Sequence, residues 1–256
     1  MSLDLSPAPG AAPAGRRLLR HARLETMLLA RNGEQLLLAL VIPAAVLVVG
    51  RFVPARIGIR FDLLVPSVLA LALFSTGFTA VAIATGFDRR HGVLERLAAT
   101  PLGRAGLVLG KAAATALVGL LQALVLVGLA LVLGWRPTLS PTGLAWAVPA
   151  VALAETAFVA GALAMASLLR AEITLALANL LHLALAAGGA LLVPADRYGP
   201  AEPVVRLLPT AALGEGLRQA LASAPASGGA LLPLVVAAVW AAVAVLVARK
   251  VMAWTS

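Results

Sequence analysis

Residues 63–86 read LLVPSVLALALFSTGFTAVAIATG, a run without Asp, Glu, Lys or Arg. A helix needs about 20 predominantly apolar residues to cross the ~30 Å hydrocarbon layer of a bilayer. The run is rich in Leu and Ala and does not alternate polar with apolar residues, so it predicts a membrane helix and not a membrane strand. This stretch decides the fold class, because similar runs recur along the chain.

Similar apolar runs lie at 35–53, 105–133, 144–169, 173–193 and 231–248. The chain is 61% hydrophobic and only 12% charged, whereas a soluble domain carries about 25% charged residues. We therefore predict an all-α polytopic membrane protein with six transmembrane helices in one domain, residues 34–256. The run at 105–133 exceeds the usual length, so either its Lys111 end projects from the bilayer or its helix tilts.

The residues before the first run divide into two parts. Residues 1–15 contain Pro7, Pro9 and Pro13 among small residues and predict a flexible tail. Residues 16–33 predict an amphipathic interfacial helix: the apolar residues Leu18, Leu19, Ala22 and Leu29 share one side, and Arg16, Arg17, Arg20, Arg23 and Arg31 the other. Such a helix lies on anionic lipid; a simple basic juxtamembrane stretch is the alternative.

Charge and residue usage exclude several function classes. The chain has no cysteine, and its histidines, His21, His91 and His182, are too far apart for a local metal motif. Although the net charge is +9, the basic residues flank apolar runs and not a soluble nucleic-acid-binding domain. Thirteen of the twenty Lys and Arg residues fall on the side of the N-terminus, which predicts cytoplasmic N- and C-termini. Arg51, Arg56 and Arg60 are exceptions.

The connection at 87–104, FDRRHGVLERLAATPLGR, is the most informative loop. Gly92 follows a charged turn, residues 93–100 can form about two helical turns, and Pro101 stops them. Val93, Leu94, Leu97 and Ala98 form an apolar strip, while Glu95 and Arg96 point elsewhere. Such a helix can dock on a soluble partner; by its pattern it can equally be a positive-inside loop resting on lipid.

The stretch RHGVLERLAATPL at 90–102, followed by Gly110 and Lys111, resembles the R-x-G-T-L-E-x-L-x-x-T-P motif of type-2 ATP-binding-cassette permeases. Val93 stands where Thr is common. The amphipathic N-terminal helix and the Leu208-Pro209-Thr210 segment also resemble that family.

The resemblance implies a permease of a bacterial plasma (inner) membrane, paired with a second copy or a paralogue. It also implies two cytosolic ATPase subunits that grip a cytoplasmic coupling helix between spans two and three. The coupling residues would be Arg90, Gly92, Val93, Leu94, Glu95, Arg96, Leu97, Thr100 and Pro101.

The sequence has no G-x-x-x-x-G-K-[S/T] phosphate-binding loop. We therefore expect this chain not to be an enzyme by itself, to bind no cofactor, and to leave ATP and Mg to the partner subunits.

Polar residues within the predicted spans are candidates for the transport path or for contacts between helices: Gln122, Glu155, Asn179 and His182. An ionised carboxylate at mid-membrane costs at least about 2.5 kcal/mol, so Glu155 must be protonated, paired or near water. It either contacts substrate or bonds a neighbour such as Thr156. Asn179 and His182, three residues apart, share a helix face.

The connection at 194–229 is too long for a simple turn. A short outer helix is predicted at 210–222, after Pro209. Glu215 and Arg218 are spaced for an exposed helical ion pair. They can instead orient a re-entrant segment that closes the pathway.

The favoured function is the permease of an ATP-driven exporter for a hydrophobic or amphipathic substrate, such as a drug, an antibiotic or a lipid-like molecule. An ion- or proton-coupled secondary transporter that uses Glu155 and His182 is the alternative. A lipid-phosphate transferase would require clustered acidic residues at a cytoplasmic helix end, and Asp88 with Glu95 does not supply them.

Overall fold

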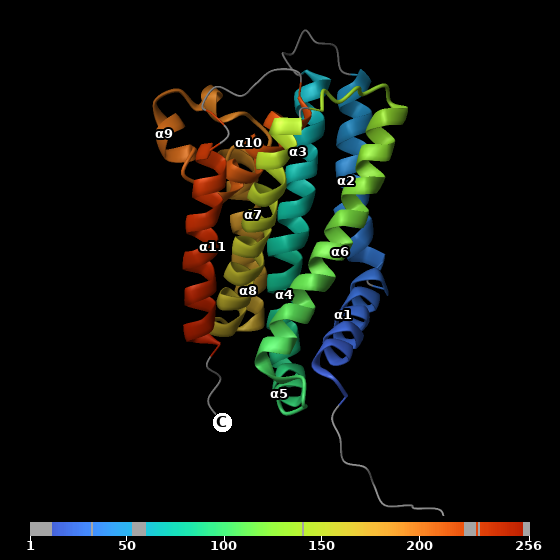
Figure 1. Cartoon of the computed structure of the whole chain (residues 1–256), viewed down its shortest axis with the longest axis vertical. Coiled ribbons are helices and arrows are strands. Elements are labelled where there is room, and N and C mark those ends of the chain that lie inside the picture. The colour runs from blue at the N-terminus through green and yellow to red at the C-terminus, as the bar shows by residue number, and fades with distance from the viewer. Residues whose placement is uncertain are drawn as a thin grey trace, which may run out of the picture.

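The computed structural model describes residues 12–31, 33–52, 60–139, 141–222, 229 and 231–252. Most of the predicted tail, residues 1–11, lies outside this range. The long helices stand side by side in one bundle, with α5 at one end and α10 near the other (Figure 1). We call these the α5 end and the α10 end.

The helices follow one another in the order α1 (Ala14–Arg31), α2 (Gly33–Phe52), α3 (Phe61–Phe74), η2 (Ser75–Ala80), α4 (Val81–Arg90), α5 (Val93–Ala98), α6 (Gly103–Val132), α7 (Pro141–Leu168), α8 (Ala171–Gly188), η3 (Ala195–Ala201), α9 (Glu202–Val205), α10 (Pro209–Leu221) and α11 (Leu231–Val251). The elements α3, η2 and α4 form one continuous helix, Phe61–Arg90, which we call the central helix. Its middle, η2, is a π-helix, in which each turn is wider than an α-helical turn.

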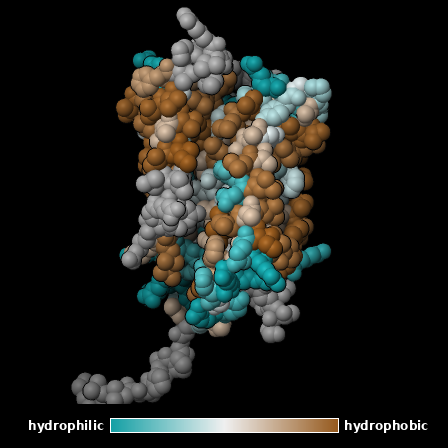
Figure 2. Space-filling model, turned by 180° about the vertical axis from the view of Figure 1, so that it is seen from behind, coloured by the Kyte–Doolittle hydropathy of each residue, from teal (hydrophilic) through white to brown (hydrophobic). Residues whose placement is uncertain are grey.

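Five helices in the described part of the chain are long and apolar enough to cross a membrane: Phe61–Arg90, Gly106–Val132, Pro141–Leu168, Ala171–Gly188 and Leu231–Val251. The predicted first span coincides with α2, whose apolar part Leu40–Phe52 is shorter. Hydrophobic residues cover much of the middle of the bundle, and hydrophilic residues gather at the α5 end (Figure 2). The chain is therefore a polytopic α-helical membrane protein. Six spans remain a prediction.

The interior of the bundle is built around α7 and the central helix. Helix α7 packs against α11, α10 and α4, and α10 also contacts α3. Phe74, Phe158, Leu163 and Leu213 are buried in one core cluster, so α10 contributes to the interior. The long connection before α11 is thus part of the packed bundle.

Helix α1 packs against α6 through the side that carries His21 and Glu25. His21 and Glu25 are buried, Leu18 and Ala22 are half-buried, and Leu19 is exposed. Leu18 and Ala22 of the predicted apolar side are thus partly covered by protein, whereas Leu19 of the same side is not. The helical wheel could not anticipate this, because Gly110 and Lys111, which His21 and Glu25 contact, lie on a distant helix. The interfacial position of the helix stays a prediction.

Two of the three arginines that are exceptions to the predicted charge distribution have polar partners in the structure. Arg51 donates from Nε to the carbonyl oxygen of Leu133 at 2.7 Å, at the C-terminal end of α6, where a positive charge is favourable. Arg60 pairs with Asp62 at 2.6 Å. Arg56 lies outside the described residues.

Candidate functional site

The central helix meets other elements through polar side chains at three levels. Ser67 lies toward the α10 end, the π-helical segment Ser75–Ala80 lies in the middle, and Asp88 to Arg90 lie at the α5 end. Each level includes residues that the sequence marks as candidates.

At the α5 end, a tight turn separates the central helix from α5. Gly92 has φ +64°, a left-handed conformation that glycine adopts without steric cost. Arg96 donates to the carbonyl oxygens of Gly92 at 3.0 Å and of His91 at 2.8 Å. The turn is therefore held from within the motif, and α5 follows the end of the central helix.

Helix α5 has one buried and one exposed side. Leu94 is fully buried, Val93 and Leu97 are half-buried, and Glu95 and Arg96 are exposed. This distribution agrees with the predicted apolar strip at Val93, Leu94 and Leu97. It leaves Glu95 and Arg96 available to a partner on the outside of the bundle.

Helix α5 is shorter than predicted, because it ends at Ala98 and not at Thr100. A residue before proline is driven out of the helical conformation, and Thr100 precedes Pro101. The Thr100 hydroxyl donates to the Leu97 carbonyl oxygen at 2.6 Å, and the Pro101 carbonyl oxygen accepts a hydrogen bond from Arg17 of α1.

Two arginines fix the end of the central helix to its neighbours. Arg89 donates to the carbonyl oxygens of Ala166 at 3.2 Å and of Leu169 at 3.4 Å, at the end of α7. Arg90 forms an ion pair with Glu172 at the start of α8. These contacts link the end of the central helix, from which α5 follows, to α7 and α8.

Lys111 of α6 joins three helices and was not a predicted site residue. Its Nζ lies 3.0 Å from Glu25 Oε2 of α1 and 2.8 Å from Asp88 Oδ2 of α4. Lys111 is buried among these side chains, and whether its end of α6 projects from the bilayer or the helix tilts stays a prediction. A lysine within an apolar run signals a need for partners, although it does not identify them.

In the middle of the bundle, the π-helical segment collects polar side chains from α6 and α8. The Thr76 hydroxyl donates to Gln122 Oε1 at 2.7 Å. Thr79 Oγ1 lies 3.2 Å from His182 Nδ1, and the imidazole stacks on Phe74 with ring centroids 5.5 Å apart. π-Helical turns occur often at functional sites. Gln122 and His182 thus belong to one polar layer.

Glu155 of α7 reaches the same segment. A Cβ atom on Gly77 would lie only 2.4 Å from Glu155 Oε2, so the carboxyl group rests against the backbone of the π-helix. Among the described residues, no partner is within hydrogen-bonding distance of the buried Oε1. Thr156 donates to the Ala152 carbonyl oxygen at 2.7 Å, so the predicted contact between Glu155 and Thr156 is wrong.

Asn179 does not join this layer. It is exposed, and its Nδ2 donates to the Leu175 carbonyl oxygen one turn earlier at 3.0 Å. Although Asn179 and His182 lie on nearby sides of α8, only His182 reaches the central helix.

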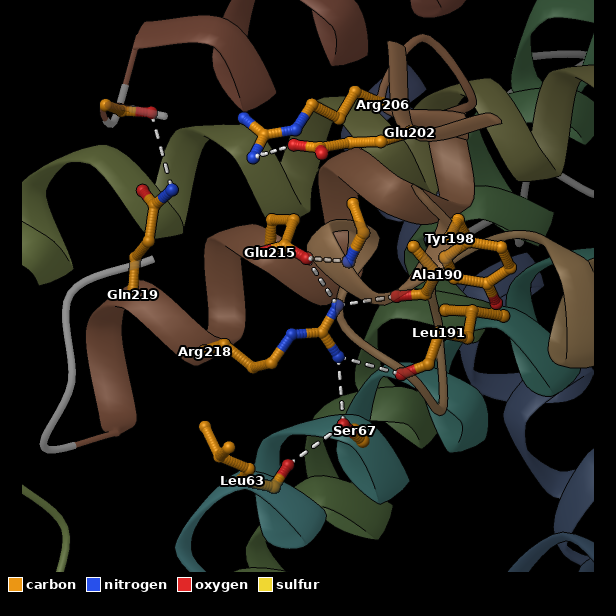
Figure 3. Close-up of polar contacts among 12 residues, drawn as sticks. Leu63, Ser67, Ala190, Leu191, Tyr198, Glu202, Arg206, Glu215, Arg218 and Gln219 are labelled. Atoms are coloured by element: carbon orange, nitrogen blue, oxygen red, sulfur yellow. Dashed lines mark hydrogen bonds and ion pairs between the residues drawn. The ribbon is translucent and has the colours of Figure 1, made fainter. Parts of the chain in front are cut away.

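Toward the α10 end, the Arg218 guanidinium is buried at 2% exposure. Nη1 donates to Ser67 Oγ and to the Leu191 carbonyl oxygen, both at 2.9 Å, and Nη2 donates to the Ala190 carbonyl oxygen at 2.6 Å (Figure 3). The prediction of an exposed ion pair is therefore wrong. A buried arginine with these partners fixes α10 both to the segment after α8 and to the central helix.

Glu215 completes this arrangement. Its Oε1 accepts from Arg218 Nη2 at 3.0 Å and from the Ala195 backbone N–H at 2.9 Å. Ala190 has φ +56°, a strained conformation for a residue with a Cβ. Pro209 occupies the first turn of α10, where its fixed φ and missing N–H are tolerated.

The fold and these contacts define a polytopic α-helical membrane protein with a charged helix displayed at one end. Residues 55–250 match the family described as ABC-2 family transporter protein. The chain belongs to this family, the type-2 ATP-binding-cassette permeases. Such permeases are generally non-catalytic membrane subunits that associate with ATP-binding-cassette ATPases. The comparison with curated proteins gave no match.

Proposed function

We propose that this chain is the permease subunit of an ATP-driven exporter that moves a hydrophobic or amphipathic substrate out of the cytoplasm. The observation that carries the proposal is the central helix, Phe61–Arg90, which leads from α5 through the polar layer to the Arg218 contacts. A single continuous helix that joins the three levels can convert movement of a bound ATPase into movement along the bundle.

In this proposal, α5 is the coupling helix and the α5 end is cytoplasmic, with both chain termini on that side. Glu95 and Arg96 are exposed beside the buried Leu94, so a groove on the ATPase can take the charged side while the apolar side stays packed. Two ATPase subunits, carrying ATP and Mg, would act on two permeases, which are copies of this chain or paralogues. Six spans, with α2 as the first, complete each permease of the bacterial inner membrane.

The polar layer and the α10 end would then control the path. Gln122, Glu155 and His182 all approach the π-helical segment, so a shift of that segment changes the polar surface in mid-membrane. Glu215 and Arg218 hold α10 against the bundle, and Pro209 begins this helix. The segment with these three residues would act as the outer gate.

Proteoliposomes containing the permease and its ATPase test the proposal. We expect substrate transport to require ATP, and replacement of Leu94 by Asp or Glu95 by Ala to abolish transport. Glu202→Ala is the control for loss of a carboxylate, since Glu202 lies in α9 near the other end. Transport that persists at the wild-type rate in both α5 variants would overturn the coupling role.

A proton-coupled secondary transporter is a second candidate, because the buried Glu155 Oε1 has no hydrogen-bond partner among the described residues. This candidate predicts transport driven by a pH gradient in vesicles without ATP or an ATPase. It also predicts that Glu155→Gln eliminates that transport. If ATP is required and the pH gradient has no effect, the exporter is retained and this candidate is rejected.

A further inference from the structure

The exposed face of α1 is composed differently along its length. At about 100° per residue, Arg16, Arg20, Arg23 and Met27 fall within one sector of about 60°. The three arginines are exposed, and the exposed apolar residues Leu24, Met27 and Leu28 follow toward α2, at 49%, 51% and 57% exposure. Leu19, at 71% exposure, borders the basic part, while the exposed residues among 24–28, nearer α2, are all apolar.

The opposite face of α1 is already occupied by protein. His21 packs on Gly110 of α6, where a Cβ atom would lie 2.2 Å from the imidazole Cδ2. Glu25 pairs with Lys111 of α6 at 3.0 Å. These buried contacts fix the rotation of α1, so the basic and apolar face cannot turn inward.

A lipid surface complements both parts of this face. Anionic phosphodiesters attract arginines, and the hydrocarbon just below them accommodates leucine and methionine side chains. A soluble partner would complement the arginines, but it would leave the exposed leucines near α2 unexplained. A lipid surface explains the order of the two parts as well as their composition.

We propose that Arg16, Arg20 and Arg23 of α1 bind the headgroups of anionic phospholipids, and that this binding positions α5. Helix α1 contacts the chain on both sides of α5. Before α5, Glu25 reaches Asp88 through Lys111, whose Nζ lies 2.8 Å from Asp88 Oδ2. After α5, Arg17 donates to the Pro101 carbonyl oxygen.

Through these two connections, a movement of α1 can move α5. Asp88 lies four residues before Gly92, the turn that begins α5, and Pro101 follows Thr100, the turn that ends it. A displacement of α1 by lipid therefore acts on both ends of the short helix. Lipid binding itself does not depend on the proposed function; only its effect on ATPase coupling does.

The absence of native cysteine allows a single reporter to be placed on α5. In the full chain, Glu95→Cys carries an environment-sensitive fluorophore, and the protein is placed in nanodiscs of phosphatidylcholine with or without phosphatidylglycerol. We expect phosphatidylglycerol to shift the emission of the wild-type background. The triple variant Arg16→Gln/Arg20→Gln/Arg23→Gln should lose the shift. The matched control Arg136→Gln/Arg197→Gln/Arg249→Gln, which removes three exposed arginines elsewhere, should keep it.

A second measurement separates binding from its effect on α5. In detergent, added phosphatidylglycerol should raise the unfolding midpoint of the wild type by about 2–4 °C. Phosphatidylcholine and inorganic phosphate should leave this midpoint unchanged. The midpoint of the α1 triple variant should not change with phosphatidylglycerol. A full response of the triple variant would overturn the lipid site. A response confined to the wild type, with no emission change at residue 95, would overturn the link to α5. Both experiments omit the ATPase, so neither result depends on transport.

Discussion

Arg218 Nη1 lies 2.9 Å from Ser67 Oγ, and these residues are 151 positions apart in the chain. The contact joins α10 to the same helix that ends at α5. Arg218 has three further partners nearby in the chain: Ala190 and Leu191, which follow α8, and Glu215, which lies in α10 itself. Arg218 therefore consolidates the segment from the end of α8 to α10 and also connects it to the central helix.

Replacement of Arg218 by Ala should destabilise the protein strongly. The change leaves the Glu215 carboxylate without its cation and removes hydrogen bonds to two buried carbonyl oxygens. Breaking a buried pair typically costs about 3–5 kcal/mol, which corresponds to a fall of at least about 6 °C in the unfolding midpoint. Ser67→Ala should cost only about 1 kcal/mol. Thermal unfolding in detergent measures both; a loss for Arg218→Ala no larger than that of the exposed Arg197→Ala would contradict the prediction.

Replacement of Gly214 by Ala should displace Arg218. A Cβ atom there would lie 2.5 Å from the Ala190 carbonyl oxygen and 2.8 Å from Arg218 Nη2, and overpacking of this kind costs about 1–3 kcal/mol. Gly161→Ala in α7 is the matched control, since nothing lies within 4 Å of its Cβ position. The control should be neutral or slightly stabilising. Equal unfolding midpoints for the two variants would refute this account of Gly214.

Replacement of Lys111 by Met should destabilise the protein, because it leaves the buried Glu25 and the half-buried Asp88 carboxylates without a cation. Glu25 and Asp88 would lose their shared cation, and the expected destabilisation is about 3–5 kcal/mol. The triple variant Lys111→Met/Glu25→Gln/Asp88→Asn, in which both carboxylates are neutral, should recover most of the lost stability, as measured by the unfolding midpoint. If the triple variant is no more stable than Lys111→Met, then Lys111 stabilises the protein mainly through packing of its aliphatic stem and not through its charge.

Replacement of Glu155 by Gln should leave the unfolding midpoint unchanged or raise it. Its Oε1 has no hydrogen-bond partner among the described residues, so replacement of the carboxyl by an amide removes no hydrogen bond made by this atom. The amide has nearly the same shape and fits against Gly77. The exposed Glu95→Gln is the control for charge removal. A marked fall in the midpoint for Glu155→Gln alone would show that the carboxylate is structurally required.

Local sequence rules predicted the helices well where the signal was itself local. The helix expected at 210–222 is α10, Pro209–Leu221, and the last run, 231–248, is α11, Leu231–Val251. Hydropathy and the positions of Pro and Gly mark these boundaries. The motif around Gly92 was equally accessible, because its turn, its buried Leu94 and its proline stop lie within a dozen residues.

Contacts between distant segments were beyond those rules. An apolar run containing Lys111 indicates that a charge needs a partner, but Glu25 is 86 residues away. The i, i+3 spacing of Glu215 and Arg218 identified their ion pair, yet gave no sign of Ser67 or of burial. The π-helical segment was also missed, since the residues STGFTA carry no hydropathy signal that distinguishes them from α-helix.

The wide turn at Ser75–Ala80 has a consequence for the geometry of the whole central helix. One extra residue in a helical turn changes the angular phase of everything beyond it by about 100°. If these six residues changed to regular α-helix, the half bearing Asp88 would rotate by that angle against the half bearing Ser67. Each half would keep its internal backbone hydrogen bonds. The central helix would then have two conformations, which differ by a rotation of one half relative to the other about the helix axis.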